Sequence, residues 1–292
     1  MAIIEIQAKA MLATISKPDG IFGIKYNMNL YRGCQHQCIY CDSRSQCYGI
    51  EDFNHDVVVK VNAPALLEKE LPRKRVKGIV GTGSMNDPYM PLEKRYALTR
   101  QSLELICHFR FGVHINTKSD LVLRDADLLQ AAGHIHATVA FSISTAEDEL
   151  ARKIEPGAPP SSARLQAMQA LADQGIATGV CMMPILPFLE DTPENITAIV
   201  EQAAAHGARF ILPWFGMSLR DRQRAYYYEQ LDRLFPALRQ RYERAFGERY
   251  GCPACSSHQL AELFYNLCKQ YGLGTRVPPF IPQNPLQQLA LF

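Results

Sequence analysis

Three cysteines in one short segment are the residues of this sequence best suited to chemistry. Cys34, Cys38 and Cys41 form a C-x3-C-x2-C spacing. A disulfide cannot use three thiols of one short loop, and a tetrahedral zinc site would need a fourth protein ligand. Thiolates favour soft metals, and iron–sulfur clusters are usually held by cysteines. The spacing therefore predicts a [4Fe–4S] cluster with one iron left open to a small molecule; a zinc knuckle or a redox-inert loop is the alternative.

With Tyr40 directly before the third cysteine, this segment resembles the signature of the radical S-adenosylmethionine (SAM) superfamily. The resemblance implies that the amino and carboxylate groups of SAM chelate the open iron. It also implies that an electron from the reduced cluster cleaves SAM, and that a 5′-deoxyadenosyl radical abstracts hydrogen from a substrate. A reducing partner such as flavodoxin or ferredoxin is then expected.

The composition sets the broad class of the protein. The chain has 292 residues, of which 47% are hydrophobic, and a formal net charge of +2. This length suits one α/β barrel, and the small net charge means that any nucleic-acid contact would come from local patches. Nine cysteines without a signal-peptide pattern at Met1–Ala13 indicate a reducing cytoplasm. The longest apolar stretch, Ile176–Leu189, is shorter than the ~20 residues of a membrane span, so we expect no membrane association.

Short apolar segments alternate with helical patterns along the first three quarters of the chain. The expected strands are Tyr26–Arg32, Gly78–Thr82, Val113–Thr117, Thr138–Ser142, Ala177–Met183 and Ala208–Pro213. The expected helices are Ala63–Leu71, Leu92–Phe109, Arg124–Ala132, Ser161–Gln174 and Pro193–His206. This alternation predicts an α/β fold, a partial (βα)6 TIM-type barrel over residues 26–218, after a lead-in over residues 1–25. The cysteine loop would follow the first strand, at the face where such barrels place active sites.

Three further blocks resemble the spore photoproduct lyase-like group of the superfamily, and the match covers roughly residues 25–190. The blocks are Gly81–Tyr89 with Pro91, Glu93, Thr99 and Arg100; Asn116–Ser119 with Arg124 and Asp125; and Phe141–Ser144 with Glu155–Gly157 and Arg164. Members that reverse spore-type thymine lesions have a hydrogen-donating cysteine in the first of these blocks. Here that block has no cysteine, so direct reversal of such a lesion is in doubt.

The resemblance assigns the SAM site to polar residues at the strand ends. Lys118 is expected to pair with the SAM carboxylate and Ser142 to hydrogen-bond to it. Alternatively, Lys118 is a solvated loop lysine and Ser142 a barrel-interior hydroxyl satisfied by backbone. Tyr40, Ser144 and Arg164 are also expected to bind the cofactor, unless Arg164 forms a structural ion pair with Glu155.

Asp87 and Tyr89 are the candidates for contact with the substrate. Asp87 would alternatively cap the helix that follows.

Residues 219–276 are predicted to form a helical extension that is rich in arginine and tyrosine. The arginines are Arg220, Arg222, Arg224, Arg233, Arg239, Arg241, Arg244 and Arg249, and the tyrosines are Tyr226, Tyr227, Tyr228 and Tyr242. The arginines could contact phosphates and the tyrosines could stack on bases, or the segment is a solvated amphipathic helix. Cys252, Cys255 and Cys268 could bind a second metal, but free cysteines are the favoured interpretation.

Residues 277–292 form a proline-rich tail whose end resembles the peptide that docks bacterial polymerases and repair factors on the DNA sliding clamp. Leu289, Leu291 and Phe292 would be apolar anchors and Gln288 an orienting amide. The tether from Val277 to Asn284 should be extended and poorly packed. The alternative is that the apolar end folds back on its own barrel.

Together these features predict a radical SAM enzyme with DNA as substrate, in repair or modification. A radical SAM enzyme acting on RNA, a peptide or a small metabolite is the second interpretation. A non-enzymatic iron–sulfur module that senses redox state is the third.

Overall fold

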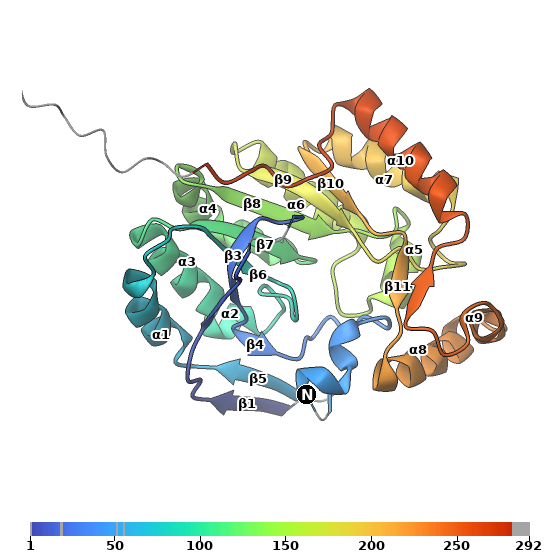
Figure 1. Cartoon of the computed structure of the whole chain (residues 1–292), viewed down its shortest axis with the longest axis horizontal. Helices are drawn as coiled ribbons and strands as arrows, with labels where there is room; N and C mark the ends of the chain where they lie inside the picture. The colour runs from blue at the N-terminus through green and yellow to red at the C-terminus, as the bar shows by residue number, and fades with distance from the viewer. Residues whose placement is uncertain (1, 18–19, 51, 55, 282–292) are drawn as a thin grey trace, which may run out of the picture.

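A twisted parallel sheet with helices on its outer face forms the centre of the molecule (Figure 1). The computed structural model describes residues 2–17, 20–50, 52–54 and 56–281. Six strands run parallel in the order β10-β9-β8-β7-β6-β3, and a short antiparallel strand, β2, borders β3. Their bounds are β2 Leu12–Thr14, β3 Ile24–Met28, β6 Ile79–Thr82, β7 Gly112–Thr117, β8 Ala137–Ser142, β9 Ala177–Met182 and β10 Phe210–Pro213. The predicted partial (βα)6 barrel is confirmed.

Helices connect the parallel strands because each crossover must return to the same end of the sheet. They are α1 Ala63–Glu70, α2 Glu93–Tyr96, α3 Leu98–His108, α4 Ala126–Gly133, α5 Asp148–Ile154, α6 Ser161–Ala172 and α7 Pro193–Ala205. α7 begins as its sequence dictates, since the Thr192 hydroxyl accepts a hydrogen bond from the Asn195 N–H and Pro193 occupies the first turn. The expected single helix Leu92–Phe109 is instead divided at Ala97, whose backbone is left-handed (φ 51°).

The beginning of the chain is more regular than the predicted lead-in. β1 (Ala2–Ile6) pairs in parallel with β5 (Asp56–Lys60), and β5 pairs antiparallel with β4 (Tyr31–Arg32) in a separate three-stranded sheet. The expected strand Tyr26–Arg32 is therefore divided between two sheets. Gly33 follows at once with φ 80°, and a Cβ there would lie 2.5 Å from the carbonyl oxygen of Asp56, so only glycine fits where the chain turns into the cysteine loop.

Two helical units complete the fold. α8 (Asp221–Leu234) and α9 (Leu238–Phe246) pack beside the cysteine loop, and a small antiparallel pair, β11 (Gly216–Ser218) with β12 (Gly251–Pro253), joins them to the barrel. α10 (Ser257–Tyr271) lies along α7, as Figure 1 shows. No helix in the described part of the chain is both long and apolar enough to cross a membrane.

The described start of the C-terminal tail is packed against the barrel. Val277 is 8% exposed and belongs to a cluster with Ala140, Cys181, Phe210 and Leu212 from β8, β9 and β10. The prediction of a poorly packed tether is therefore wrong for Val277, because this side chain fills the inner side of the sheet. The clamp-like residues Gln288, Leu289, Leu291 and Phe292 lie outside the described residues.

Candidate active site

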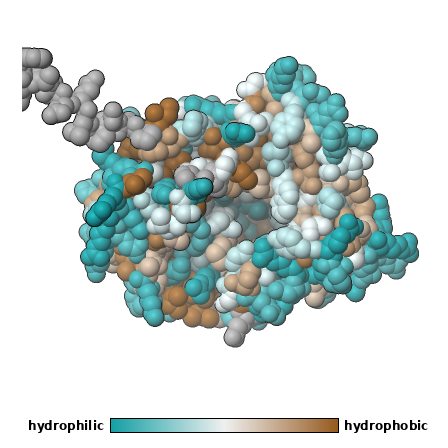
Figure 2. All heavy atoms as spheres, in the orientation of Figure 1, coloured by the Kyte–Doolittle hydropathy of each residue, from teal (hydrophilic) through white to brown (hydrophobic). Residues whose placement is uncertain are grey.

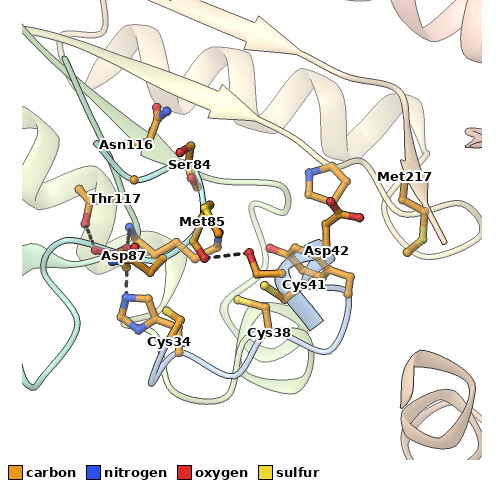
Figure 3. Close-up of a pocket in the computed structure, with 18 of the residues that line it drawn as sticks. Cys34, Cys38, Cys41, Asp42, Ser84, Met85, Asp87, Asn116, Thr117 and Met217 are labelled. Atoms are coloured by element: carbon orange, nitrogen blue, oxygen red, sulfur yellow. Dashed lines mark hydrogen bonds and ion pairs between the residues drawn. The ribbon is translucent and has the colours of Figure 1, made fainter. Parts of the chain in front are cut away.

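A cavity of about 190 Å³ lies where the carboxyl ends of the barrel strands meet the cysteine loop. Its lining comes from the cysteine loop, from the segment after β6, from the ends of β7 and β8, and from residues after β9 and β10. Figure 2 shows the molecule hollowed near the middle of this face. Figure 3 shows the three cysteines along one side of the cavity and Ser84, Met85 and Asn116 along another.

The thiols of Cys34, Cys38 and Cys41 all line this cavity. Burial raises the pKa of Cys34 to about 12, and it also raises the pKa values of Cys38 and Cys41. A thiol whose pKa is raised in this way stays protonated near neutral pH unless a bound metal ion stabilises the thiolate.

The donor set can be compared with what each kind of metal site requires. Within the described residues, no three His, Cys, Asp or Glu side chains come close enough to hold a single metal ion. A mononuclear zinc site would need sulfurs roughly 3.8 Å apart, from the tetrahedral geometry and a Zn–S bond of ~2.3 Å. In a cubane cluster each thiolate binds its own iron, so the sulfurs stand further apart. Three thiols that face one cavity without forming a site for a single ion therefore fit a [4Fe–4S] cluster with an open iron.

Lys118 and Ser142 are brought to the cavity as expected. The Lys118 ammonium lies 3.7 Å from Oε1 of Glu155. Burial alone would lower the pKa of Lys118, but Cys38 and Glu155 raise it above its ordinary value. The result is a fixed positive charge beside the thiols, suited to hold a carboxylate.

Asp87 lines the cavity, but protein groups already surround its carboxylate. Oδ1 accepts hydrogen bonds from the Thr117 hydroxyl (2.7 Å) and the Tyr89 N–H (2.8 Å), and Oδ2 accepts one from the Lys118 N–H (2.6 Å). Nε2 of His36, within the cysteine loop, is 3.1 Å from Oδ2. Burial by itself would raise the pKa of Asp87, but His36 and these hydrogen bonds lower it to about 2. Asp87 thus ties the cysteine loop to the end of β7.

Tyr40 and Arg164 act together around a buried carboxylate. The Tyr40 hydroxyl donates to Oε1 of Glu155, and Nη2 of Arg164 is 2.5 Å from Oε2. Arg164 also donates to the carbonyl oxygen of Ser142 at 2.8 Å. Burial alone would raise the pKa of Glu155, but Arg164 and Lys118 hold it below its ordinary value. Tyr40 lines the cavity, whereas Arg164 is fully buried behind it, so the structure gives Arg164 the ion pair with Glu155 and a positioning role.

Besides Arg164, two expected site residues do not line the cavity. Ser144 is buried at 3% exposure and is not among the lining residues. Tyr89 is fully buried, with its ring 5.9 Å from the Arg124 guanidinium. Both residues lie beyond the strand ends, in irregular segments that continue past the lining residues Asp87 and Ser142 into the interior.

Three of the four tyrosines in the arginine–tyrosine segment do not offer the expected stacking surface. Tyr227, Tyr228 and Tyr242 are buried between α8, α9 and the cysteine loop, and the Tyr227 hydroxyl donates to that of Tyr242 at 2.9 Å. The prediction that bases stack on these three tyrosines is therefore wrong, because their rings form a core. Arg224 and Arg239 are likewise engaged, by carbonyl oxygens and by carboxylates respectively.

Cys252, Cys255 and Cys268, the candidates for a second metal, lie in three different surroundings. Cys252 packs in the core beside α8 and α9, Cys268 packs in the main core, and Cys255 is exposed. All nine cysteines lie in the described part of the chain, and none is in a disulfide.

Two residues that line the cavity, and one buried carboxylate behind it, were not expected from the sequence. Asn86 lines the cavity at 5% exposure, and in the described part of the chain neither Nδ2 nor Oδ1 of its amide has a hydrogen-bond partner. Trp214, just after β10, lines the cavity while remaining 46% exposed. Glu190 is fully buried, and burial raises its pKa to about 8. Position after a strand end could have indicated Asn86 and Trp214; nothing local distinguishes Glu190 from a surface glutamate.

The comparisons with known proteins agree with this geometry. The sequence profile of the radical SAM superfamily matches residues 28–211. An uncharacterized protein of Mycobacterium tuberculosis is 33% identical over 267 residues, which cover 89% of this chain and 78% of the relative. An uncharacterized protein of Methanocaldococcus jannaschii is 39% identical over 191 residues, which cover 65% of this chain and 70% of the relative.

Solved structures share the fold. Spore photoproduct lyase complexed with dinucleoside spore photoproduct matches with a TM-score of 0.69 and 15% identity, over 92% of this chain and 79% of that chain. A variant of that lyase has been solved with AdoMet bound as well. The chain belongs to the radical SAM superfamily, and it is an enzyme that uses a [4Fe–4S] cluster and SAM.

Proposed function

We propose that this enzyme acts on a nucleobase in DNA, in repair or modification. The observation that carries the proposal is Trp214, whose half-exposed indole lies on the cavity rim with Pro184 and Met217. Stacking of a base on an aromatic side chain is worth ~1–3 kcal/mol and tolerates any base. A flat aromatic substrate suits this wall better than a peptide or a flexible metabolite does.

Asn86 supports the same substrate class. A buried amide with no partner costs ~1–3 kcal/mol for each unsatisfied group, so this side chain is poised for a ligand. An adjacent donor and acceptor on the ligand would satisfy both amide atoms, and base edges present such pairs.

The chain's own residues have separable roles in this proposal. Bound cluster and SAM supply the 5′-deoxyadenosyl radical of the family. Lys118 and Ser142 hold the SAM carboxylate, Tyr40 and Glu155 keep Lys118 in place, and Asp87 fixes the cysteine loop. None of the six cysteines outside the cluster loop lines the active cavity itself, although Cys47 lines a second cavity that shares Met85 with it. We therefore favour a reaction other than direct reversal of a spore-type lesion.

Anaerobic turnover tests this function. The reduced, cluster-loaded enzyme is incubated with SAM and ultraviolet-damaged or undamaged DNA, and nucleosides and 5′-deoxyadenosine are quantified by mass spectrometry. We expect a change in a DNA nucleoside and its loss in Trp214→Ala, with Trp214→Phe retaining most of it. Products that appear only with RNA or only with peptides would contradict the proposal.

We also propose that the tail recruits the enzyme to the DNA sliding clamp in the cytoplasm. Free thiols throughout the chain suit a reducing compartment. Pro278 lies with Ala137, Ala177 and Arg209 at the amino ends of the strands, opposite the active cavity. A peptide tethered there would leave the cavity free for DNA. Deleting Gln288–Phe292 should abolish clamp binding at roughly micromolar affinity, about −8 kcal/mol, without loss of iron. Loss of the cluster on deletion would contradict a docking role.

A further inference from the structure

A second cavity of about 390 Å³ adjoins the active cavity. Met85 lines both of them, and Tyr48 lies on the wall of the second. The two cavities therefore share a wall at Met85.

Two cations line this second cavity. Arg32 on β4 stands opposite Val58 on β5, and Lys60 is two residues further along β5, so Arg32 and Lys60 share one face of the sheet. Diagonal neighbours on a sheet face are close enough for long side chains to meet.

Neither cation is neutralised by a carboxylate in the described part of the chain. The Lys60 ammonium donates to the carbonyl oxygen of Asn29 at 2.6 Å, and the Arg32 side chain is exposed with no hydrogen bond or ion pair to another described residue. Burial and, after it, the charge of Arg32 lower the pKa of Lys60. This arrangement differs from that of Arg239 on α9, which pairs with the carboxylates of Asp232 and Glu243. Two like charges facing one cavity are relieved by a bound anion.

We propose that Arg32 and Lys60 bind a phosphate of a nucleic-acid strand whose target base occupies the active cavity. The proposal rests on the nucleic-acid substrate proposed above. Arg32 supplies a planar fork that matches two phosphate oxygens, and Lys60 supplies a point charge. The site is concave and shares Met85 with the active cavity, so a polymer that carries phosphates on either side of a base is the kind of ligand that occupies both. An acidic protein docking on a flat surface would need no such adjacency.

The test is the salt dependence of binding. The cluster-loaded protein is titrated anaerobically with a short fluorescein-labelled single-stranded oligodeoxynucleotide at several salt concentrations, and anisotropy gives the affinity. Arg32→Gln with Lys60→Gln should make the slope of log affinity against log salt shallower by about 0.7, the value for one phosphate contact on a single strand. Arg32→Lys alone should keep the wild-type slope. The control is Lys69→Gln on the exposed face of α1, which should change nothing.

Each failure has its own meaning. If the wild type binds no oligonucleotide at any salt concentration, the nucleic-acid function itself fails. If the wild type binds and the double variant has the wild-type slope, only the phosphate site is wrong. Slower reduction by a flavodoxin with an unchanged slope would overturn the proposal in favour of an electron-donor surface. A parallel loss of SAM affinity, measured by equilibrium dialysis, would also overturn it, because the two cations would then act on the active cavity.

Discussion

Two regions of this molecule are rich in charged and hydroxyl groups, and they use them differently. At the strand ends of the barrel, Lys118, Asp87 and Ser142 all converge on one cavity beside three thiols. In α8 and α9, Tyr242 is a core residue and Arg239 pairs with carboxylates on its own helices. The polar groups of the first region face a ligand cavity, whereas those of the second region bond to one another.

The difference follows from the geometry of the elements. Parallel strands end at one edge of the sheet, so polar residues just past those ends meet whether or not they bind each other. Helix surfaces present side chains in every direction, and an arginine there is satisfied by the nearest carbonyl or carboxylate. The composition of a helical segment therefore does not predict whether its polar side chains bind a ligand. The position of a polar residue directly after a parallel strand is a much better predictor.

The largest expected effect comes from the cysteine loop. Replacing Cys34, Cys38 and Cys41 by alanine removes every thiol of the cavity, so we expect complete loss of bound iron and of the brown colour. Cys255→Ala, an exposed cysteine of the second region, is the matched control and should retain both. Iron and sulfide analysis of the anaerobically reconstituted proteins decides this; full iron content in the triple variant would refute the cluster assignment.

Glu190 lies where the two regions meet, near Glu155 on one side and Tyr227 and Tyr242 on the other. Its carboxyl has a pKa of about 8 in the folded protein against an ordinary 4.5, so folding takes up a proton between these values. Stability should therefore fall as the pH rises from 4.5 to 8, by on the order of 1.4 kcal/mol per pKa unit. Glu190→Gln should remove this part of the pH dependence, measured by thermal unfolding across that window. Parallel curves for the variant and the wild type would show that Glu190 is ionised in the fold.

Lys118→Ala tests whether the polar residues that meet at the strand ends of the barrel bind SAM. Removing the ammonium should weaken SAM binding by ~1.5–3 kcal/mol, the scale of a hydrogen bond to a charged group. Glu155 keeps Arg164 as a partner, so the fold should persist. Equilibrium dialysis with labelled SAM gives the affinity, and Lys118→Arg should recover part of it. Unchanged affinity in the alanine variant would leave Lys118 as a structural partner of Glu155.

The sequence predicts the first region well and the second poorly, for the reasons given above. The cysteine spacing, Lys118 and Ser142 could be identified because spacing and strand ends constrain them. Tyr89 and Ser144 could not be separated from their neighbours, because both lie beyond the strand ends, where side chains do not follow a regular alternation. The pairing of β1 with β5 could not be predicted, because the two strands lie more than fifty residues apart in the sequence. Burial of Tyr227 and Tyr242 depends on packing against the cysteine loop, which no local pattern reveals.

Tyr242→Phe tests whether the second region is a core. The Tyr242 hydroxyl donates to the carbonyl oxygen of Pro187 at 2.7 Å and accepts from Tyr227. Its removal leaves a buried carbonyl and a buried hydroxyl without a partner, so we expect a loss of ~1–3 kcal/mol in unfolding free energy. Oligonucleotide affinity should not change. Weaker binding without a change in stability would restore the stacking role for this segment.

The smallest effect is expected for the exposed arginines of α9. Arg239 pairs with Asp232 at 2.9 Å and with Glu243, one helical turn along, at 2.8 Å, and all three side chains are about half exposed. Surface pairs of this kind contribute little, because solvent screens them and the side chains lose freedom when they pair. Arg239→Gln should therefore leave the free energy of unfolding nearly unchanged in denaturant titrations. The substitution should also leave the slope of log affinity against log salt for oligonucleotide binding unchanged, since the Arg239 guanidinium is already paired with two carboxylates. If the slope instead becomes shallower by as much as in the Arg32 and Lys60 double variant, the two regions are not distinct, and α9 forms part of the nucleic-acid surface.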